Sequence, residues 1–129
     1  MENKRETLLI GTSDRSLQRE LAGAFRNSEL IFTDTVEETE LALLEKNIDV
    51  LIYDLKAILD FSLAAYGVIK KMRPRLPVIA ITSAEAPQQD RKILEMGIFY
   101  LLHRPFAMDT LKQLVISAVE KSKKGEVLP

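Results

Sequence analysis

Polar side chains follow five apolar runs in this sequence, and their types can carry phosphoryl, metal or acid–base chemistry. These polar positions are Thr12, Ser13 and Asp14; Asp34; Asp54; Thr82 and Ser83; and His103 and Arg104. An aspartate can accept a phosphoryl group or bind a divalent cation, and a hydroxyl can contact the transferred group. An arginine can pair with both oxygens of a carboxylate or a phosphate. The chemistry depends on whether the fold brings the five positions to one place.

The composition narrows the kinds of site that these residues can form. The chain of 129 residues has no cysteine and one histidine, His103, which excludes thiol catalysis, thiolate metal sites and multi-histidine metal sites within one chain. A formal net charge of −1 gives no reason to expect direct nucleic-acid binding. No apolar run approaches the ~20 residues that cross a membrane, and the start MENKRET lacks an apolar signal segment. We therefore expect a cytoplasmic protein that contacts neither nucleic acid nor a membrane.

Apolar runs and helical periodicity predict the elements that position these side chains. Short runs that suit a sheet buried on both faces predict strands at residues 7–10, 30–32, 49–54, 78–82 and 99–103. A helix is expected after each strand, and the last three are expected at 63–72, 88–96 and about 108–123. Thr35 and Glu38 have the spacing of a capping box, which predicts the start of the second helix.

The alternation of strand and helix predicts the α/β class. Five strand–helix pairs imply right-handed crossovers and one parallel sheet with helices on both faces. Ligands of such doubly wound sheets bind outside the carboxyl ends of the strands, so the five polar positions are expected to meet there. The length suits one domain, expected at 7–122, with an N-terminal extension at 1–6 and a C-terminal tail or linker at 123–129.

The stretch after the first strand has several possible roles. The simplest interpretation is that Thr12 and Ser13 end the strand and that Ser13 or Asp14 caps the following helix. Anion binding at the N-terminus of that helix is the alternative. A nucleophilic Ser13 would need His103, the single histidine, as its base within hydrogen-bond reach, and we regard that pair as disfavoured.

Three segments carry a family resemblance. DVLIYDL, PVIAITS and MGIFYLLHRPF, in this order and spacing, resemble the receiver domain of bacterial two-component response regulators over about residues 7–121. The resemblance implies a flavodoxin-like (βα)5 three-layer sandwich with strand order 2-1-3-4-5. It also implies that Asp54 occupies the phosphoacceptor position, Thr82 the position of the switch hydroxyl, and Leu101 that of the switch aromatic residue.

The chain departs from the receiver pattern at the positions that bind metal and phosphate. Thr12 and Ser13 stand where receivers have two acidic residues, and Arg104 stands where they have a lysine. Mg²⁺ prefers carboxylate and water oxygens, and neutral hydroxyls are weak ligands. Asp54 is then the main candidate ligand, with Asp14 a weak substitute. We expect no cofactor and no metal, with Mg²⁺ relevant only if the phosphorylation pocket works.

Arg104 suggests a different state of the pocket. The planar guanidinium can pair with both oxygens of a carboxylate, whereas lysine is a compact point charge. Arg104 is therefore expected to bind Asp54 directly and to hold the domain in one state, as a pseudo-receiver that is not an enzyme. We expect it to act through contacts with a histidine kinase or an output domain.

A homodimer is a further expectation. The resemblance places it on the face formed by the fourth helix, the fifth strand and the fifth helix. The candidate residues there, some of which must belong to the core, are Tyr100, Leu101, Met108 and Leu111.

Two other functions stay open from the sequence. In one, Asp54 still accepts phosphate slowly, as in an ordinary receiver. In the other, the chain senses a small anionic ligand or a nucleotide in the crevice. The residues that would line that crevice are Thr12, Ser13, Thr82 and Arg104.

Overall fold

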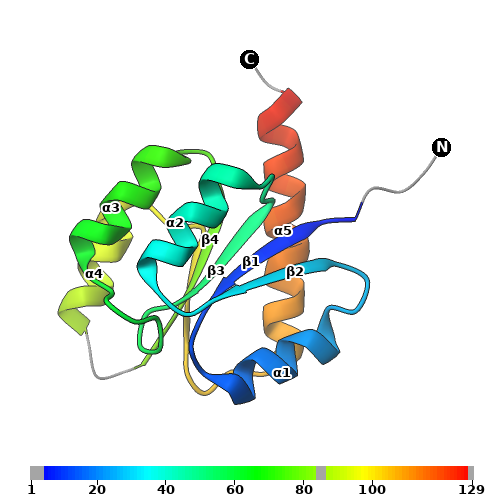
Figure 1. Ribbon diagram of the computed structural model, residues 1–129, viewed down its shortest axis with the longest axis horizontal. Helices are drawn as coiled ribbons and strands as arrows, with labels where there is room; N and C mark the ends of the chain where they lie inside the picture. The colour runs from blue at the N-terminus through cyan, green and yellow to red at the C-terminus, as the bar shows by residue number, and fades with distance from the viewer. Residues whose placement is uncertain (1–4, 84–86, 128–129) are drawn as a thin grey trace.

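The computed structural model describes the backbone of residues 5–83 and 87–127, and the side chains of these residues up to Lys123. In these ranges five strands alternate with five helices (Figure 1). The strands are β1 (Thr7–Gly11), β2 (Glu29–Thr33), β3 (Val50–Asp54), β4 (Val78–Thr82) and β5 (Tyr100–His103). The helices are α1 (Arg15–Ala24), α2 (Val36–Glu45), α3 (Leu63–Met72), α4 (Pro87–Met96) and α5 (Met108–Val127).

The five strands form one parallel sheet in the order β2-β1-β3-β4-β5. The predicted order 2-1-3-4-5 is therefore confirmed, and the strand order reverses between β1 and β3. Every residue of β3 and β4 is buried, as expected for continuous apolar runs in the middle of a parallel sheet. Asp54 ends the central strand β3, so its carboxylate lies at the carboxyl ends of the strands, where the polar positions were expected to meet.

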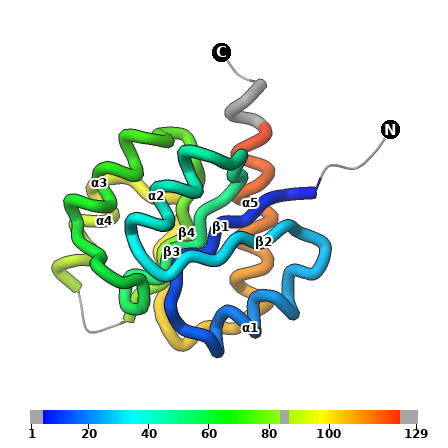
Figure 2. The backbone as a smooth tube through the Cα atoms, in the orientation of Figure 1, coloured from blue at the N-terminus to red at the C-terminus, as the bar shows by residue number. Residues whose placement is uncertain are grey.

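Helices cover both faces of the sheet, which gives the predicted three-layer sandwich (Figure 2). On one face, α2, α3 and α4 pack over a core that includes Leu9, Leu51 and Tyr66. On the other face, α1 and α5 pack over a core that includes Ile10 and Ile52. Alternate residues of β1 and β3 thus belong to opposite cores, and both layers fix the position of the β3 end.

The ends of most elements lie close to the predicted positions, and α5 differs most. This helix continues to Val127, past its expected end near residue 123. The segment EKSKKGEV contains Gly125 but no proline, and its lysines and glutamates favour helix, so the helix can continue past residue 123. In the described ranges, no helix combines the length and the apolar character needed to cross a membrane.

The predicted cap of α2 is present. The Thr35 hydroxyl accepts a hydrogen bond from the Glu38 amide at 3.0 Å. The Glu38 carboxylate accepts one from the amide of Asp34 at 2.8 Å, one residue earlier than an ideal capping box would place it. The cap therefore orders the β2–α2 turn, which borders the sheet edge.

Candidate functional site

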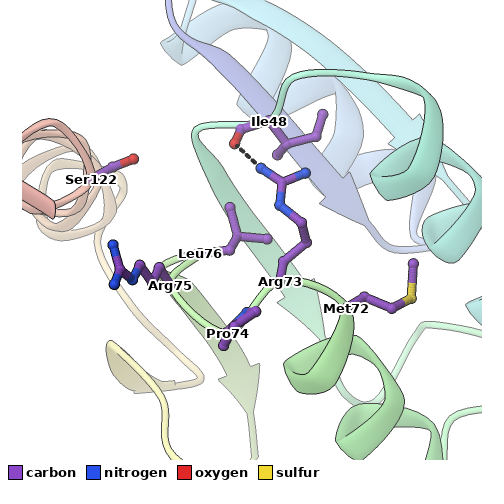
Figure 3. A pocket seen from close by; sticks show the side chains of 7 residues that line it. All are labelled: Ile48, Met72, Arg73, Pro74, Arg75, Leu76 and Ser122. Carbon is purple, nitrogen blue, oxygen red and sulfur yellow. Dashed lines mark hydrogen bonds between the residues drawn. The ribbon is translucent and has the colours of Figure 1, made fainter. Parts of the chain in front are cut away.

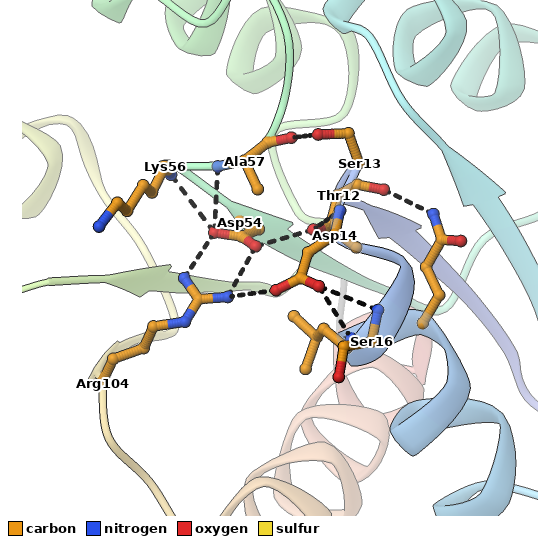
Figure 4. Close-up of polar contacts among 10 residues, drawn as sticks. Thr12, Ser13, Asp14, Ser16, Asp54, Lys56, Ala57 and Arg104 are labelled. Atoms are coloured by element: carbon orange, nitrogen blue, oxygen red, sulfur yellow. Dashed lines mark hydrogen bonds and ion pairs between the residues drawn. The ribbon is translucent and has the colours of Figure 1, made fainter.

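The carboxyl ends of β1, β3 and β5 bring three of the predicted site residues into contact (Figure 4). Thr12 directly follows β1, Asp54 is the last residue of β3, and Arg104 directly follows β5. Asp54 is 1% exposed, whereas the Arg104 side chain is 27% exposed. The site is therefore a buried carboxylate with a cation that covers it from the solvent side.

Arg104 pairs with both oxygens of Asp54. Its Nη1 donates to Oδ1 and its Nη2 donates to Oδ2, each at 2.9 Å. The hydrogen bonds to Asp54, and the attraction of that carboxylate, raise the pKa of Arg104, while burial opposes the rise. The direct contact that the sequence suggested is thus present, in the bidentate geometry that a guanidinium allows and an ammonium does not.

Other donors complete the surroundings of the Asp54 carboxylate. The Thr12 hydroxyl donates to Oδ2 at 2.7 Å. The amides of Lys56 and Ala57 each donate to Oδ1 at 3.3 Å, which is a longer contact. Both oxygens of Asp54 therefore have hydrogen-bond partners from the chain itself, and the buried charge is compensated.

Thr12, Ser13 and Asp14 have three separate roles. Asp14 caps α1, because its Oδ1 accepts from the amides of Ser16 at 3.0 Å and Leu17 at 3.2 Å. The hydroxyl of Ser13 donates to the carbonyl of Ala57. The prediction that Ser13 or Asp14 caps the helix is confirmed for Asp14. The Thr12 hydroxyl instead bonds Asp54 at the end of β3, and the Ser13 hydroxyl bonds the loop after β3.

Asp14 also faces the site. Its Oδ2 lies 3.7 Å from Nη2 of Arg104, so the guanidinium stands between two carboxylates. A cleft of about 320 Å³ opens beside this contact, with Glu20 of α1 and Phe106 and Met108 after β5 among its lining residues. Its lining holds two carboxylates, Asp14 and Glu20, and one cation, Arg104, which already pairs with Asp54, so the cleft has little positive charge to offer an anionic ligand.

The donor set does not fit Mg²⁺. Hydroxyls stand at the two positions where a receiver would supply carboxylates, and the Asp54 oxygens are taken up by Arg104 and Thr12. One oxygen of Asp14 is used in the cap and the other faces Arg104. Across residues 5–83 and 87–123, no group of three or more histidine, cysteine, aspartate or glutamate side chains could hold a metal ion. The site fits a guanidinium better than a divalent cation.

Thr82 and His103 belong to a neighbouring group of contacts. The Thr82 hydroxyl donates to Oδ1 of Asp90 at 2.8 Å, and Nε2 of His103 lies 3.0 Å from Oδ2 of the same carboxylate. The structure does not bring His103 to Ser13, whose hydroxyl is bound to the loop after β3. Sequence reasoning missed Asp90, and the available signal was an acidic residue in the first turn of α4.

Asp34 lies outside the site. Its carboxylate pairs with Arg15 at 2.7 and 2.9 Å on the surface, and the hydrogen bonds from Arg15 lower the pKa of that carboxyl group. The expectation that all five polar positions meet therefore holds for only some of them. The turn after β2 points Asp34 toward α1 instead.

The candidates for a dimer face differ in exposure. Tyr100 is 46% exposed, whereas Leu101 is half-buried against the core under α2, α3 and α4. Met108 packs against the core under α1 and α5. Leu111 is fully buried in that core, so its place among the surface candidates was wrong. Its spacing with Val115 is that of the inner face of α5.

A second cleft, of about 340 Å³, lies near the amino ends of β3 and β4 (Figure 3). Arg73 lines it and donates to the carbonyl oxygens of Leu43 at 3.3 Å and Ile48 at 3.2 Å. These bonds tie the end of α3 to the α2–β3 connection. The side chain of Arg75 extends in a different direction from that of Arg73, so the two guanidinium groups do not converge on one point in Figure 3.

Comparison with known proteins gives matches of structure. No family model and no curated protein matches the sequence. A response regulator receiver domain protein from Clostridium thermocellum aligns with a TM-score of 0.82 at 20% identity, over 92% of this chain and 97% of that one. NtrX from Brucella abortus aligns at 0.83 and 22% identity, over 96% of this chain and 29% of that one.

A third similar structure is an adenylate cyclase from Rhodopirellula baltica, with a TM-score of 0.84 at 15% identity. The alignment covers 96% of this chain and 97% of the cyclase chain. At such identities the likeness concerns the fold, and it agrees with the strand order and the helix layers described above. This chain has the fold of the response regulator receiver domains, as its sequence motifs predicted.

Proposed function

We propose that this chain is a receiver-like signalling domain of a two-component or phosphorelay system, in which a permanent ion pair occupies the phosphoacceptor position. In this proposal the domain acts by binding another protein and catalyses no reaction. The observation that carries the proposal is the pairing of Arg104 with both oxygens of Asp54, a carboxylate that is 1% exposed.

The contacts of Asp54 oppose its phosphorylation. Phosphoryl transfer needs a carboxylate oxygen that faces the phosphorus in line, and it needs positive charge that neutralises the transferred group. Each oxygen of Asp54 already accepts a hydrogen bond from Arg104, and Oδ2 accepts a second from Thr12. Freeing either oxygen would break an ion pair whose charges are largely removed from water, which is costly.

The ion pair also supplies a constant charge. In an ordinary receiver the charge at this position changes when a metal ion and a phosphoryl group arrive. The Arg104 guanidinium stays protonated at every physiological pH, and its contact with Asp54 raises its pKa further. The domain would therefore keep one conformation at the carboxyl ends of β1, β3 and β5, and its partner would recognise that conformation.

The surface that we assign to this partner is the α4–β5–α5 face. Four large apolar side chains lie exposed on its three elements: Leu94 at 56% and Met96 at 37% on α4, Tyr100 at 46% on β5 and Ile116 at 51% on α5. Exposed apolar residues on neighbouring elements are typical of protein contacts. The receiver fold favours a histidine kinase, an output domain or a second copy of the chain as the partner.

The deciding experiment follows amide chemical shifts of the labelled chain while Mg²⁺ and then beryllofluoride, a mimic of aspartyl phosphate, are added. We expect no saturable change at Asp54, Thr82 or Arg104. The comparison variant combines Thr12→Asp, Ser13→Asp and Arg104→Lys, which restores the acids and the lysine of the receiver pattern. In that variant we expect saturable changes around Asp54.

A parallel measurement uses acetyl phosphate with Mg²⁺ and peptide mass analysis. The wild-type chain should gain no phosphoryl mass, and an Asp54→Asn change in the restored variant should abolish any gain seen there. A phosphoryl group located on Asp54 of the wild-type chain would contradict the proposal. It would indicate a working phosphoacceptor, in which Arg104 leaves Asp54 before transfer.

A further inference from the structure

Helix α4 buries fewer apolar side chains than any other described helix. Ile93 is its one buried apolar side chain, and its other buried residue is the acid Asp90. Each of the other described helices buries at least two apolar side chains. Segments with few buried apolar contacts open locally at a low cost in free energy. Polar contacts therefore decide how firmly α4 is held.

The Asp90 carboxylate connects α4 to two strands at once. Oδ1 accepts from the Thr82 hydroxyl at 2.8 Å, and Oδ2 lies 3.0 Å from Nε2 of His103. Thr82 ends β4, His103 ends β5, and the two residues are direct partners in the sheet. Asp90 is 8% exposed and its bond with Thr82 is buried, so water competes weakly for that bond.

The other end of α4 has a separate anchor. The hydroxyl of Tyr66 on α3 donates to the carbonyl of Gly97, directly after α4, at 2.7 Å. Loss of the Asp90 contacts would therefore free the first turns of α4 while its last turn stays attached to α3. In this arrangement the C-terminal end of α4 stays fixed to α3, and the Asp90 contacts hold its N-terminal half to β4 and β5.

We propose that Asp90 is a latch that sets the position of α4, and with it the shape of the α4–β5–α5 face. This inference rests on the proposed function, because that face is where the proposed protein contact is made. With the latch closed, the Thr82 hydroxyl is bound to Asp90 and the ends of β4 and β5 are joined to α4. A protein partner can then bias the latch by binding α4, without any chemistry at Asp54.

The test is hydrogen exchange of backbone amides in the full chain, comparing α4 with β3 in each variant. Asp90→Ala should speed exchange of the α4 amides by about tenfold or more, since it removes two hydrogen bonds that involve a carboxylate. The amides of β3 should be affected much less. Asp90→Asn keeps an oxygen that can accept from Thr82, so it should recover part of the protection.

Two control variants separate the latch from general effects of removing an acid. Asp109→Ala removes an exposed acid from the first turn of α5, which matches the loss of a favourable charge at a helix N-terminus. Glu95→Ala removes an exposed acid from α4 itself. Neither acid has a hydrogen bond or ion pair within the described residues, so neither variant should speed exchange in its own helix to a similar degree.

His103→Ala tests the bridge with little risk to folding, because this side chain is half exposed. As a single substitution it should speed exchange of the α4 amides. Combined with Asp90→Ala, it should cause no further increase in that exchange rate. The latch is refuted if Asp90→Ala affects α4 no more than the two controls do, or if it speeds β3 exchange equally. Phosphorylation of wild-type Asp54 would overturn the proposed function and leave these exchange ratios unchanged, so the two failures are distinguishable.

Discussion

At the scale of single residues, two bidentate guanidinium–carboxylate pairs among the described residues differ in their surroundings. Arg104 pairs with a carboxylate that is almost fully buried, whereas Arg15 and Asp34 pair on the surface. Water weakens the surface pair and solvates either partner when the other is lost. The buried carboxylate has no such replacement, so the two pairs should contribute very differently to stability.

Replacing Arg104 tests this difference. Arg104→Ala should lower the free energy of unfolding by about 2 kcal/mol, because it leaves Asp54 buried without its countercharge. Arg104→Lys should lower it less, since the charge remains but the bidentate contact is lost. Urea denaturation measures both changes, with Arg15→Ala as the matched surface control. Equal losses from Arg15→Ala and Arg104→Ala would show that burial adds nothing to the Arg104 pair.

Two buried tyrosines provide a second test at this scale. Burial raises the pKa of both, but only Tyr66 has a hydrogen-bond acceptor, the Gly97 carbonyl, while the Tyr53 hydroxyl has no partner in the described part of the chain. Tyr66→Phe should lower the free energy of unfolding by about 1 kcal/mol. Tyr53→Phe should leave it unchanged or raise it, because it removes an unsatisfied buried group. Thermal melts of the pair give the comparison, and a loss from Tyr53→Phe would reveal an unseen partner.

At the scale of elements, α1 depends on one side chain for its start. Asp14 accepts from two amides of the first turn and also faces Arg104. Asp14→Ala should lower the free energy of unfolding by about 1 kcal/mol, since it removes the cap. Asp14→Asn keeps a good capping oxygen and should cost much less. If the asparagine variant is as unstable as the alanine variant, the charge facing Arg104 matters more than the cap.

The sequence predicts elements better than it predicts contacts between them. Strand and helix periods predicted the elements and the parallel α/β class, because they depend on neighbours along the chain, and the receiver resemblance supplied the strand order. The contact of Thr12 with Asp54 was missed, since it spans 42 residues and depends on how the ends of β1 and β3 lie beside each other. Asp90 was missed for the same reason, as its partners end two different strands. The contact of Arg104 with Asp54 was predicted because the receiver resemblance places both residues in one pocket, where a guanidinium can pair with both carboxylate oxygens.

At the scale of the whole molecule, the exposed apolar side chains of α4, β5 and α5 predict association. If a second copy is the partner, sedimentation of the wild-type chain should show a mass that rises with concentration. Ile116→Glu places a charge on an exposed apolar position of α5 and should abolish the rise. Leu44→Glu on α2 is the control, because Leu44 is more exposed, at 72%, but lies on another helix. A constant monomer mass for the wild-type chain would exclude the homodimer and leave a different protein as the partner.

The pairing of Arg104 with Asp54 also has a consequence for the kinetics of folding. The two residues are 50 positions apart, and Arg104 follows the last strand of the sheet. The ion pair can therefore form only after β5 has docked, when most of the chain is already in place. Interactions that form after the rate-limiting step slow unfolding and leave the folding rate nearly unchanged. In stopped-flow experiments, loss of Arg104 should accelerate the unfolding arm and barely move the refolding arm, so this pair acts chiefly to extend the lifetime of the folded state.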